Sequence, residues 1–290
     1  MPPHPVSLGI DVEDWFHPEL VHDRVPSGDA RTIVREGTGF ILDLLRRRQA
    51  RATFFVLGEV AERHPDLVRR IAGEGHEIAC HGMTHRPLWR LTPPEFRKEL
   101  RDFRAAVRAA LGSDPSVGFR APTFSLDRTT AWALGVLREE GFRYDSSVFP
   151  LRVSLYGVAG APLGIYRPAL DDLALHDPAG AVVEFPVAVC PVGPLRLPVA
   201  GGFYLRALPL GLLSGALEAI RRERPAALYV HPWECAPSLP RLSLPGVSGI
   251  VTYLNLGSVP RKLERIVERF GSVPMREILE RLGHLPPAAA

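Results

Sequence analysis

Side chains that could do chemistry stand in a few short groups, each directly after an apolar run that predicts a β-strand. Because the carboxyl ends of parallel strands carry the active site in βα folds, we expect the groups to meet at one edge. A further polar strand end follows at Asp145. The main groups are three carboxylates, two histidines, an arginine and a lone histidine: Asp11, Glu13, Asp14, His81, His85, Arg120 and His231.

The first group places three carboxylates within the run Asp11-Val12-Glu13-Asp14. They repel one another unless a cation, a proton or full hydration offsets their charge. Side chains alternate along a strand, so Asp11 and Glu13 share a face, and Asp14 joins them only where the backbone turns. The alternative interpretation is a solvated acidic loop.

The other groups are weak signals when taken one at a time. In His81-Gly82-Met83-Thr84-His85 both imidazoles share one face of a helical turn, a common way to offer two ligands to a metal, although chance pairs are frequent. Arg120, next to a turn fixed by Pro122, can hold a carboxylate through its planar fork, but a surface arginine would look the same. His231 leaves a buried strand into a Pro-Trp turn, and its alternative is a half-buried structural histidine.

One reaction type uses all these groups together. Two histidines and one carboxylate bind a divalent metal, usually zinc, and leave a position open. Such a metal lowers the pKa of bound water to about 7 and polarises a carbonyl. A second carboxylate then acts as the base, and a separate histidine protonates the leaving group. The combination predicts metal-assisted hydrolysis of an amide or an ester.

Alternating strands and helices must position these groups, and this alternation indicates βα units in a parallel sheet or barrel. The clearest helix begins with a capping box formed by Thr92 and Glu95 and ends at Gly112. Residues 150–200 are rich in proline and glycine and predict a β-rich insertion, and residues 237–255 predict a loop. The pattern predicts strands over 6–11, 52–57, 77–80, 117–120 and 227–230, and helices over 39–49, 60–73, 92–111, 130–140, 208–222, 261–270 and 275–282.

Composition sets limits on the kind of protein. The chain has 290 residues, 46% hydrophobic and 23% charged, with a formal net charge of +3. This excludes disorder for most of the chain, and the charge is too small to predict nucleic-acid binding. Three widely spaced cysteines argue against a disulfide framework and a four-cysteine zinc site. No apolar run approaches the roughly 20 residues of a membrane span, and residues 1–6 lack the features of a signal peptide. We therefore expect a cytoplasmic protein, which could also act at the inner face of the membrane.

Taken together, the motifs make the chain resemble the polysaccharide deacetylases of carbohydrate esterase family 4, the NodB-homology family. The exopolysaccharide- and PEP-CTERM-associated branch of that family is the most similar. The resemblance implies a distorted (β/α) barrel of about seven parallel strands in one domain over residues 1–290, with the insertion near 150–200 and closing helices near 259–283. The motifs are His-Gly-Met-Thr-His at 81–85, Asp-Val-Glu-Asp-Trp-Phe-His at 11–17, Arg-Ala-Pro-Thr-Phe at 120–124, Tyr-Asp-Ser-Ser-Val-Phe-Pro at 144–150 and Val-His-Pro-Trp-Glu at 230–234.

The resemblance also implies a role for each matching residue. Asp11 matches the catalytic base, Arg120 the arginine that orients it, and His231 the catalytic acid. Asp145 matches the segment that shapes the pocket near the acid, and the backbone N–H of Thr123 would lie near the oxyanion. The family pattern has two adjacent aspartates where this chain has Asp11-Val12, so the carboxylate ligand is Glu13 or Asp14, with strand alternation favouring Glu13. The remaining expected contacts are the metal ligands His81 and His85 and the substrate contacts Phe124 and Trp233.

The predicted function is removal of N-acetyl groups from an amino-sugar-containing polysaccharide, or its precursor, in exopolysaccharide biosynthesis. The expected cofactor is a divalent metal, in the first place Zn²⁺, and the expected partners are the glycan and the exopolysaccharide assembly machinery. One alternative is an allantoinase-like hydrolase of a cyclic amide, which would need residues 150–200 and 237–255 to close over the metal. A second alternative is a catalytically inactive glycan-binding module, against which the presence of both base and acid argues.

Overall fold

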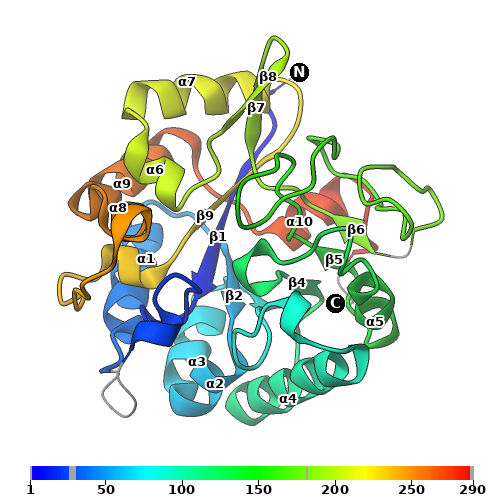
Figure 1. The fold of residues 1–290 in the computed structure, drawn as a ribbon, viewed down its shortest axis with the longest axis horizontal. Coiled ribbons are helices and arrows are strands. Elements are labelled where there is room, and N and C mark those ends of the chain that lie inside the picture. The colour runs from blue at the N-terminus through cyan, green and yellow to red at the C-terminus, as the bar shows by residue number, and fades with distance from the viewer. Residues whose placement is uncertain (1, 26–30, 181, 288–290) are drawn as a thin grey trace.

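The computed structural model describes residues 2–25, 31–180 and 182–287. Within these residues, seven strands form one sheet in the order β6-β5-β4-β3-β2-β1-β9, and every neighbouring pair is parallel (Figure 1). The expected distorted barrel of about seven parallel strands is therefore confirmed. The strands are β1 Val6–Val12, β2 Thr53–Val56, β3 Glu77–Cys80, β4 Gly118–Phe119, β5 Tyr144–Asp145, β6 Val183–Glu184, β7 Val189–Val192, β8 Leu195–Pro198 and β9 Ala226–Val230.

Helices surround the sheet (Figure 1), and the main apolar core lies between the two. None of the helices in the described residues has the length and apolarity that a membrane crossing requires. The α-helices are α1 Val34–Arg47, α2 Gly58–Arg63, α3 Pro65–Gly73, α4 Pro93–Leu111, α5 Ala133–Glu139, α6 Phe203–Ala207, α7 Leu210–Arg221, α8 Gly246–Tyr253, α9 Val259–Phe270 and α10 Met275–Arg281. The short 3₁₀ helices are η1 His22–Arg24, η2 Leu88–Arg90, η3 Pro122–Phe124, η4 Pro232–Cys235 and η5 Leu256–Ser258.

The two edges of the sheet approach each other through isolated bridges instead of a continuous ladder. After β6, Val187 pairs with Ala227 of β9, and farther along Gly201 pairs with Tyr229. The amide of Ala188 also donates to the carbonyl of Ala227 at 2.8 Å. These contacts curl the sheet into a barrel whose wall is irregular between β6 and β9.

Helix α10 covers the end of the barrel where the strands begin. The amide of Val273 donates to the carbonyl of Val6 at 3.0 Å, and the amide of Met275 donates to Oγ1 of Thr53 at 2.8 Å. The opposite end, where the strands finish, is thereby left for the functional site. The apolar face of α10 joins buried strand residues in one cluster: Phe55, Ala79, Tyr144, Val183, Met275, Ile278 and Leu279.

The helix predictions are confirmed most closely where local signals are strong. In α4 the amide of Thr92 donates to Oε2 of Glu95 at 2.8 Å, and Gly112 ends the helix at a φ of 82°. The helix predicted over 60–73, with Pro65 near its start or at a kink, is two helices, because Pro65 lacks an N–H and starts a new one. Helix α1 begins at Val34, earlier than predicted.

The segment predicted as a β-rich insertion serves two purposes. Its strand β6 extends the main sheet beside β5, whereas β7 and β8 form a separate antiparallel hairpin. The main sheet therefore takes strands from both halves of the chain. The organisation as one domain over 1–290 stays a prediction, and residues 1, 26–30, 181 and 288–290 of that range lie outside the described residues.

Candidate active site

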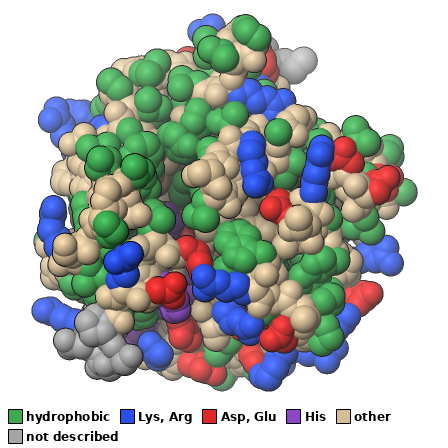
Figure 2. All heavy atoms as spheres, in the orientation of Figure 1, with side chains coloured by type: hydrophobic (Ala, Val, Ile, Leu, Met, Phe, Trp, Pro, Cys, Tyr) green, Lys and Arg blue, Asp and Glu red, His purple; other side chains and the backbone are tan. Residues whose placement is uncertain are grey.

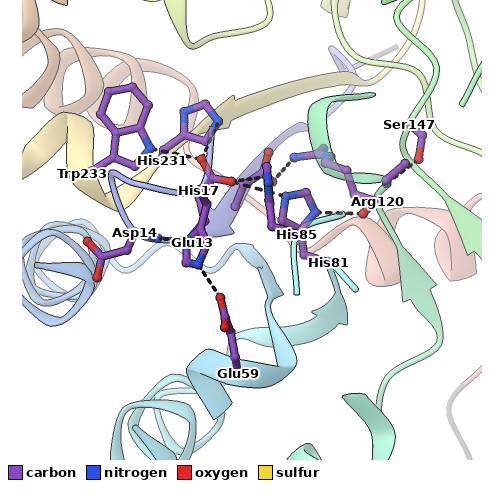
Figure 3. A network of polar contacts seen from close by, with 12 residues as sticks. Glu13, Asp14, His17, Glu59, His81, His85, Arg120, Ser147, His231 and Trp233 are labelled. Carbon is purple, nitrogen blue, oxygen red and sulfur yellow. Dashed lines mark hydrogen bonds and ion pairs between the residues drawn. The ribbon is translucent and has the colours of Figure 1, made fainter. Parts of the chain in front are cut away.

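Four strand ends bring the predicted polar groups together. The carboxyl ends of β1, β3, β4 and β9 meet at the open end of the barrel, and Figure 3 shows their side chains converging there. Figure 2 shows histidine and carboxylate side chains in a hollowed part of this face. Arg120 is fully buried in the wall behind them. The predicted residues that line the pocket are Asp11, Glu13, His81, His85, Thr123, Phe124, His231 and Trp233.

Three of these side chains form a group that could hold a metal ion. The ligand atoms of Glu13, His81 and His85 all lie within 4.8 Å of one another. Oε2 of Glu13 is 2.5 Å from Nε2 of His85 and 3.8 Å from Nε2 of His81. Glu13 follows β1 and both histidines follow β3, two strands that flank β2, so the strand order itself gathers the group.

The surroundings of this group fit a divalent cation. Nδ1–H of His81 donates to the carbonyl of Arg120 at 2.8 Å, which leaves Nε2 unprotonated and facing Glu13. Burial lowers the pKa of His81 to about 4, so this imidazole is neutral at neutral pH, as a ligand must be. Burial raises the pKa of Glu13, but charge on His85 and His231 outweighs it and lowers that pKa overall. A buried, ionised carboxylate beside a neutral imidazole suits a metal.

Asp14, the other candidate ligand, points away from the histidines, and the expectation that included it needs correction. Its carboxylate accepts hydrogen bonds from the amides of Ile33, at 3.1 Å, and Val34, at 3.3 Å, and from the hydroxyl of Thr32. These groups lie at the start of α1, where a carboxylate satisfies free amides and is favoured by the helix dipole. The carboxylate of Asp14 is therefore committed to the helix, and Glu13 alone joins the histidines.

Asp11 and Arg120 form a buried pair beside the metal group. Nη1 of Arg120 donates to Oδ1 of Asp11 at 2.6 Å, while its Nε and Nη2 donate to the carbonyl and the hydroxyl of Ser146, both at 3.0 Å. Gly9 makes room for the guanidinium, because a Cβ there would lie 2.6 Å from Nη1. Gly9 was not singled out from the sequence; its signal is a glycine inside an apolar strand.

His231 approaches the same group from the end of β9. Its Nε2 lies 3.8 Å from Oε1 of Glu13, and its Nδ1 lies 3.0 Å from Oε2 of Glu234. The other oxygen of Glu234 is 2.9 Å from Nε of the buried Arg206. Burial would lower the pKa of His231, but the carboxylates of Glu13 and Glu234 raise it to about 9. His231 therefore carries a proton at neutral pH.

Two of these neighbours were not assigned a role from the sequence. Glu234 lies three residues after His231 in the His-Pro-Trp-Glu motif, and this short spacing could have indicated their contact. Arg206 gave no such signal, because its partner follows β9 while Arg206 itself lies in α6.

Trp233 packs against the metal group and is buried, although it also lines the pocket in which a sugar contact is expected. Its Nε1–H donates to Oε1 of Glu13 at 3.1 Å. Its ring stacks on His231, with 5.2 Å between centroids and 16° between planes. The indole therefore orients a candidate ligand and a candidate acid, and only part of its surface faces the pocket.

The turn after β4 brings backbone into the pocket. Thr123 and Phe124 both have left-handed φ angles, 57° and 49°, which strain residues other than glycine. The amide of Ala121, just before the turn, donates to Oγ of Ser147 at 2.8 Å, and that hydroxyl donates to Oδ1 of Asp145 at 2.6 Å. Asp145 is fully buried, and these bonds connect it to the pocket turn through Ser147. The placement favours a positioning role for Asp145, which matches the segment expected to shape the pocket near the acid.

The loop that carries both histidines is attached to α4 by Glu99, which sequence reasoning missed. The amides of Met83 and Thr84 donate to Oε2 of Glu99 at 2.8 and 2.9 Å. The hydroxyl of Thr84 donates to Oε1 at 2.7 Å. In the sequence, Glu99 looks like any acidic residue on the solvated side of a helix, so no signal distinguished it.

Comparison with known proteins agrees with this geometry. A family model described as polysaccharide deacetylase matches residues 20–144. A second model, described as a domain of unknown function (DUF3473), matches residues 146–280. The first match contains the histidine pair and Arg120, and the second contains His231.

Two curated relatives carry deacetylase names. A chitooligosaccharide deacetylase of Rhizobium leguminosarum bv. trifolii is 45% identical over 73 residues, which are 25% of this chain and 34% of that protein. A peptidoglycan-N-acetylglucosamine deacetylase of Bacillus cereus is 36% identical over 100 residues, 34% of this chain and 36% of that protein. The chain spans about a third of the length of these relatives.

Solved structures share the fold over the whole chain. A Mycobacterium smegmatis protein named as a polysaccharide deacetylase superposes with a TM-score of 0.60 at 23% identity, covering 100% of this chain and 98% of that one. An allantoinase (Puue) gives 0.59 at 17% identity, covering 100% and 96%. At these identities the likeness shows the fold alone, and the family rests on the sequence matches. Residues 20–144 match the polysaccharide deacetylase family model, and the named relatives confirm the resemblance that the motifs indicated.

Proposed function

We propose that the chain is a metal-dependent hydrolase that removes N-acetyl groups from an amino-sugar-containing polysaccharide, or its precursor, in exopolysaccharide biosynthesis. The observation that carries the proposal is the convergence of Glu13, His81 and His85 with Asp11 and His231 in one pocket. The match to the family model supports the reaction class. The exopolysaccharide assignment rests on the motifs that resemble that branch.

Glu13, His81 and His85 would hold the metal, and we propose Zn²⁺ because two imidazoles and one carboxylate are a common catalytic zinc set. A bound divalent ion would lower the pKa of a water molecule and polarise the acetamido carbonyl. The chain supplies the orientation of the ligands: the Nε1–H of Trp233 holds Glu13, and the carbonyl of Arg120 holds His81.

Asp11 and His231 would move the protons. Arg120 binds Oδ1 of Asp11, which leaves Oδ2 to accept the proton of the attacking water. His231, protonated and held at Nδ1 by Glu234, would deliver the proton on Nε2 to the departing amine nitrogen. The backbone N–H of Thr123, in the turn held by Ser147, would stabilise the oxyanion. The products are acetate and a free amino sugar.

The deciding experiment combines metal analysis with an acetate assay on N-acetylglucosamine oligomers. We expect one metal per chain and acetate release that a chelator abolishes and zinc restores. The His81→Ala variant should lose both the metal and the activity, because an imidazole ligand is removed. A protein that binds no metal after zinc reconstitution would contradict the proposal and favour the inactive glycan-binding alternative.

A second candidate is hydrolysis of a small cyclic amide. Tyr156, from the segment 150–200, and Val251, from the segment 237–255, both line the pocket, as a substrate-enclosing site requires. Allantoin in the same assay separates the two functions: its turnover without acetate release would favour the second. The cytoplasmic location and the link to the assembly machinery stay predictions, which cell fractionation and co-purification with that machinery would check.

A further inference from the structure

Helix α8 is apolar, and within the described residues one of its faces is exposed although Arg206 binds carbonyls at its C-terminal end. Residues 242–260 contain no Asp, Glu, Lys, Arg or His, and none of the residues of α8 is buried. Val247 is 73% exposed and Ile250 is 57% exposed. Exposed apolar patches on a folded surface are a common mark of a binding site. The exposed apolar face of α8 is therefore a candidate binding surface.

The same helix forms part of the catalytic pocket. Val251 and Thr252 line the pocket that holds Asp11 and the metal group. Leu155, which is 39% exposed, lines it as well. Figure 2 shows hydrophobic side chains gathered over α6, α7 and α8 beside the hollow of the site. Helix α8 thus contributes both to the pocket, through Val251 and Thr252, and to the exposed apolar surface, through Val247 and Ile250. A substrate whose acetamido group reaches the pocket can extend along this helix.

The chemistry of this surface favours a hydrocarbon chain over a sugar ring. Its exposed members Leu155, Val247 and Ile250 are aliphatic, whereas sugar rings are usually held by aromatic stacking and hydrogen bonds. Exposed arginines flank the uncharged segment in the sequence at Arg241 and Arg261, and Cζ of Arg241 lies 5.5 Å from the ring centroid of Tyr253 at the end of α8. Basic residues beside an exposed apolar helix favour an anionic amphiphile.

We propose that α8 and Leu155 bind the hydrocarbon chain of an amino-sugar substrate carried on an anionic, phosphate-linked long-chain lipid. The inference rests on the deacetylase function proposed above and names its substrate class. The hydrocarbon chain lies along Val247 and Ile250, the phosphate lies near Arg241, and the sugar enters the pocket.

The test compares two phosphodiesters of N-acetylglucosamine, one with a dodecyl group and one with a methyl group. We expect kcat/KM to be about tenfold or more higher for the dodecyl compound, mainly through a lower KM, because each buried CH₂ favours binding. In the double variant Val247→Ser/Ile250→Ser the ratio between the two substrates should fall toward one. The matched control is Leu170→Ser, because Leu170 is 60% exposed and does not line the pocket; its ratio should equal that of the unaltered protein.

Two results would overturn the proposal: equal kcat/KM for both substrates, or a ratio that the double variant leaves unchanged. Should the unaltered protein turn over neither compound, the proposed deacetylation of such substrates fails. Calorimetric titration with dodecyl phosphate then still tests whether α8 binds a hydrocarbon chain. The double variant should bind this compound about tenfold more weakly than the unaltered protein. Co-sedimentation with phosphatidylglycerol vesicles tests whether α8 instead binds a membrane. Vesicle binding that the double variant loses, without any chain-length effect on activity, would assign α8 to the membrane and overturn the substrate assignment.

Discussion

Glu13 is tightly held, because each of its carboxylate oxygens has its own neighbour. Oε1 accepts the indole N–H of Trp233 at 3.1 Å, and Oε2 lies 2.5 Å from Nε2 of His85. A ligand fixed in this way loses little freedom when a cation binds, and supporting contacts of this kind commonly change metal affinity by about 10–100-fold. The metal group is therefore largely formed before the ion arrives.

The assignment of Asp11 as the base predicts a specific separation of effects. Asp11→Asn keeps the side-chain size but removes the proton acceptor, so kcat should fall by about 10²–10⁴-fold. The metal content should not change, because Asp11 is not among Glu13, His81 and His85. Acetate release and metal analysis on the same preparation check both. The exposed Asp171→Asn variant is the control, and an Asp11→Asn protein that keeps most of its activity would show that the base lies elsewhere.

Gly9 predicts an effect that passes through Arg120. A methyl group at this position would lie 2.6 Å from Nη1 and 2.9 Å from Nη2, so Gly9→Ala must displace the guanidinium and with it Asp11. We expect kcat to fall about tenfold or more. Gly135→Ala is the matched control: open space surrounds that position in α5, and alanine favours a helix by about 1 kcal/mol over glycine. It should leave kcat unchanged and raise Tm slightly, and equal kcat in both variants would refute the role of Gly9.

Most of the candidate site could be predicted from residue types at strand ends. His81, His85, Arg120 and His231 all lie where the alternation of strands and helices places them. Strand alternation favoured Glu13 over Asp14 but did not exclude Asp14, because the outcome depends on the turn after β1 and on the start of α1.

At the scale of the elements, the start of α1 is the clearest case of a local pattern failing. Its first amides are satisfied by Asp14, a residue that follows β1 and lies far from Val34 in the chain. Because the capping residue is distant in sequence, the residues just before the helix carry no capping motif. Helix α4, whose cap Thr92 and Glu95 are both local, was predicted correctly for the same reason.

The turn after β4 predicts a role for a hydroxyl that touches no substrate. Ser147→Ala removes the acceptor for the amide of Ala121 and the donor to Asp145. An unsatisfied buried amide costs about 1–3 kcal/mol, and relaxation of the turn would move the N–H of Thr123. We expect kcat to fall about tenfold with KM changed less than twofold. Ser147→Thr, which keeps the hydroxyl, should recover much of the loss; a fall in stability with unchanged kcat would mean that the turn does not position the oxyanion.

At the scale of the whole molecule, catalysis and stability are assigned to opposite ends of the barrel. Leu279 of α10 is fully buried, whereas Leu282 just beyond that helix is 43% exposed. Leu279→Ala should lower the free energy of unfolding by about 2–5 kcal/mol, with kcat at 25 °C unchanged in the protein that remains folded. Leu282→Ala should change neither, and denaturant unfolding with acetate release checks the pair. A kcat loss in folded Leu279→Ala would show that the two ends are coupled.

The order of strands in the barrel follows from βα alternation, but its closure does not. The strands β4, β5 and β6 each have only two residues, too few for an alternation of polar and apolar residues to be recognised. The edges then meet at isolated pairs such as Val187 with Ala227. Isolated pairs of this kind depend on the tertiary structure, so no local sequence pattern predicts them.

The contacts of β1 have a consequence for the chain as it is synthesised. Val6 pairs with Ala226, and its carbonyl accepts the amide of Val273, so both partners are synthesised much later than Val6 itself. On the ribosome, β1 can pair early with β2 on one side. Its other side pairs with β9, and the end of the barrel is covered by α10, and both elements emerge much later. Contacts so distant in sequence slow folding. The nascent chain therefore exposes an unpaired strand edge and apolar surface until α10 has emerged, and exposed surfaces of this kind favour aggregation and chaperone binding in general.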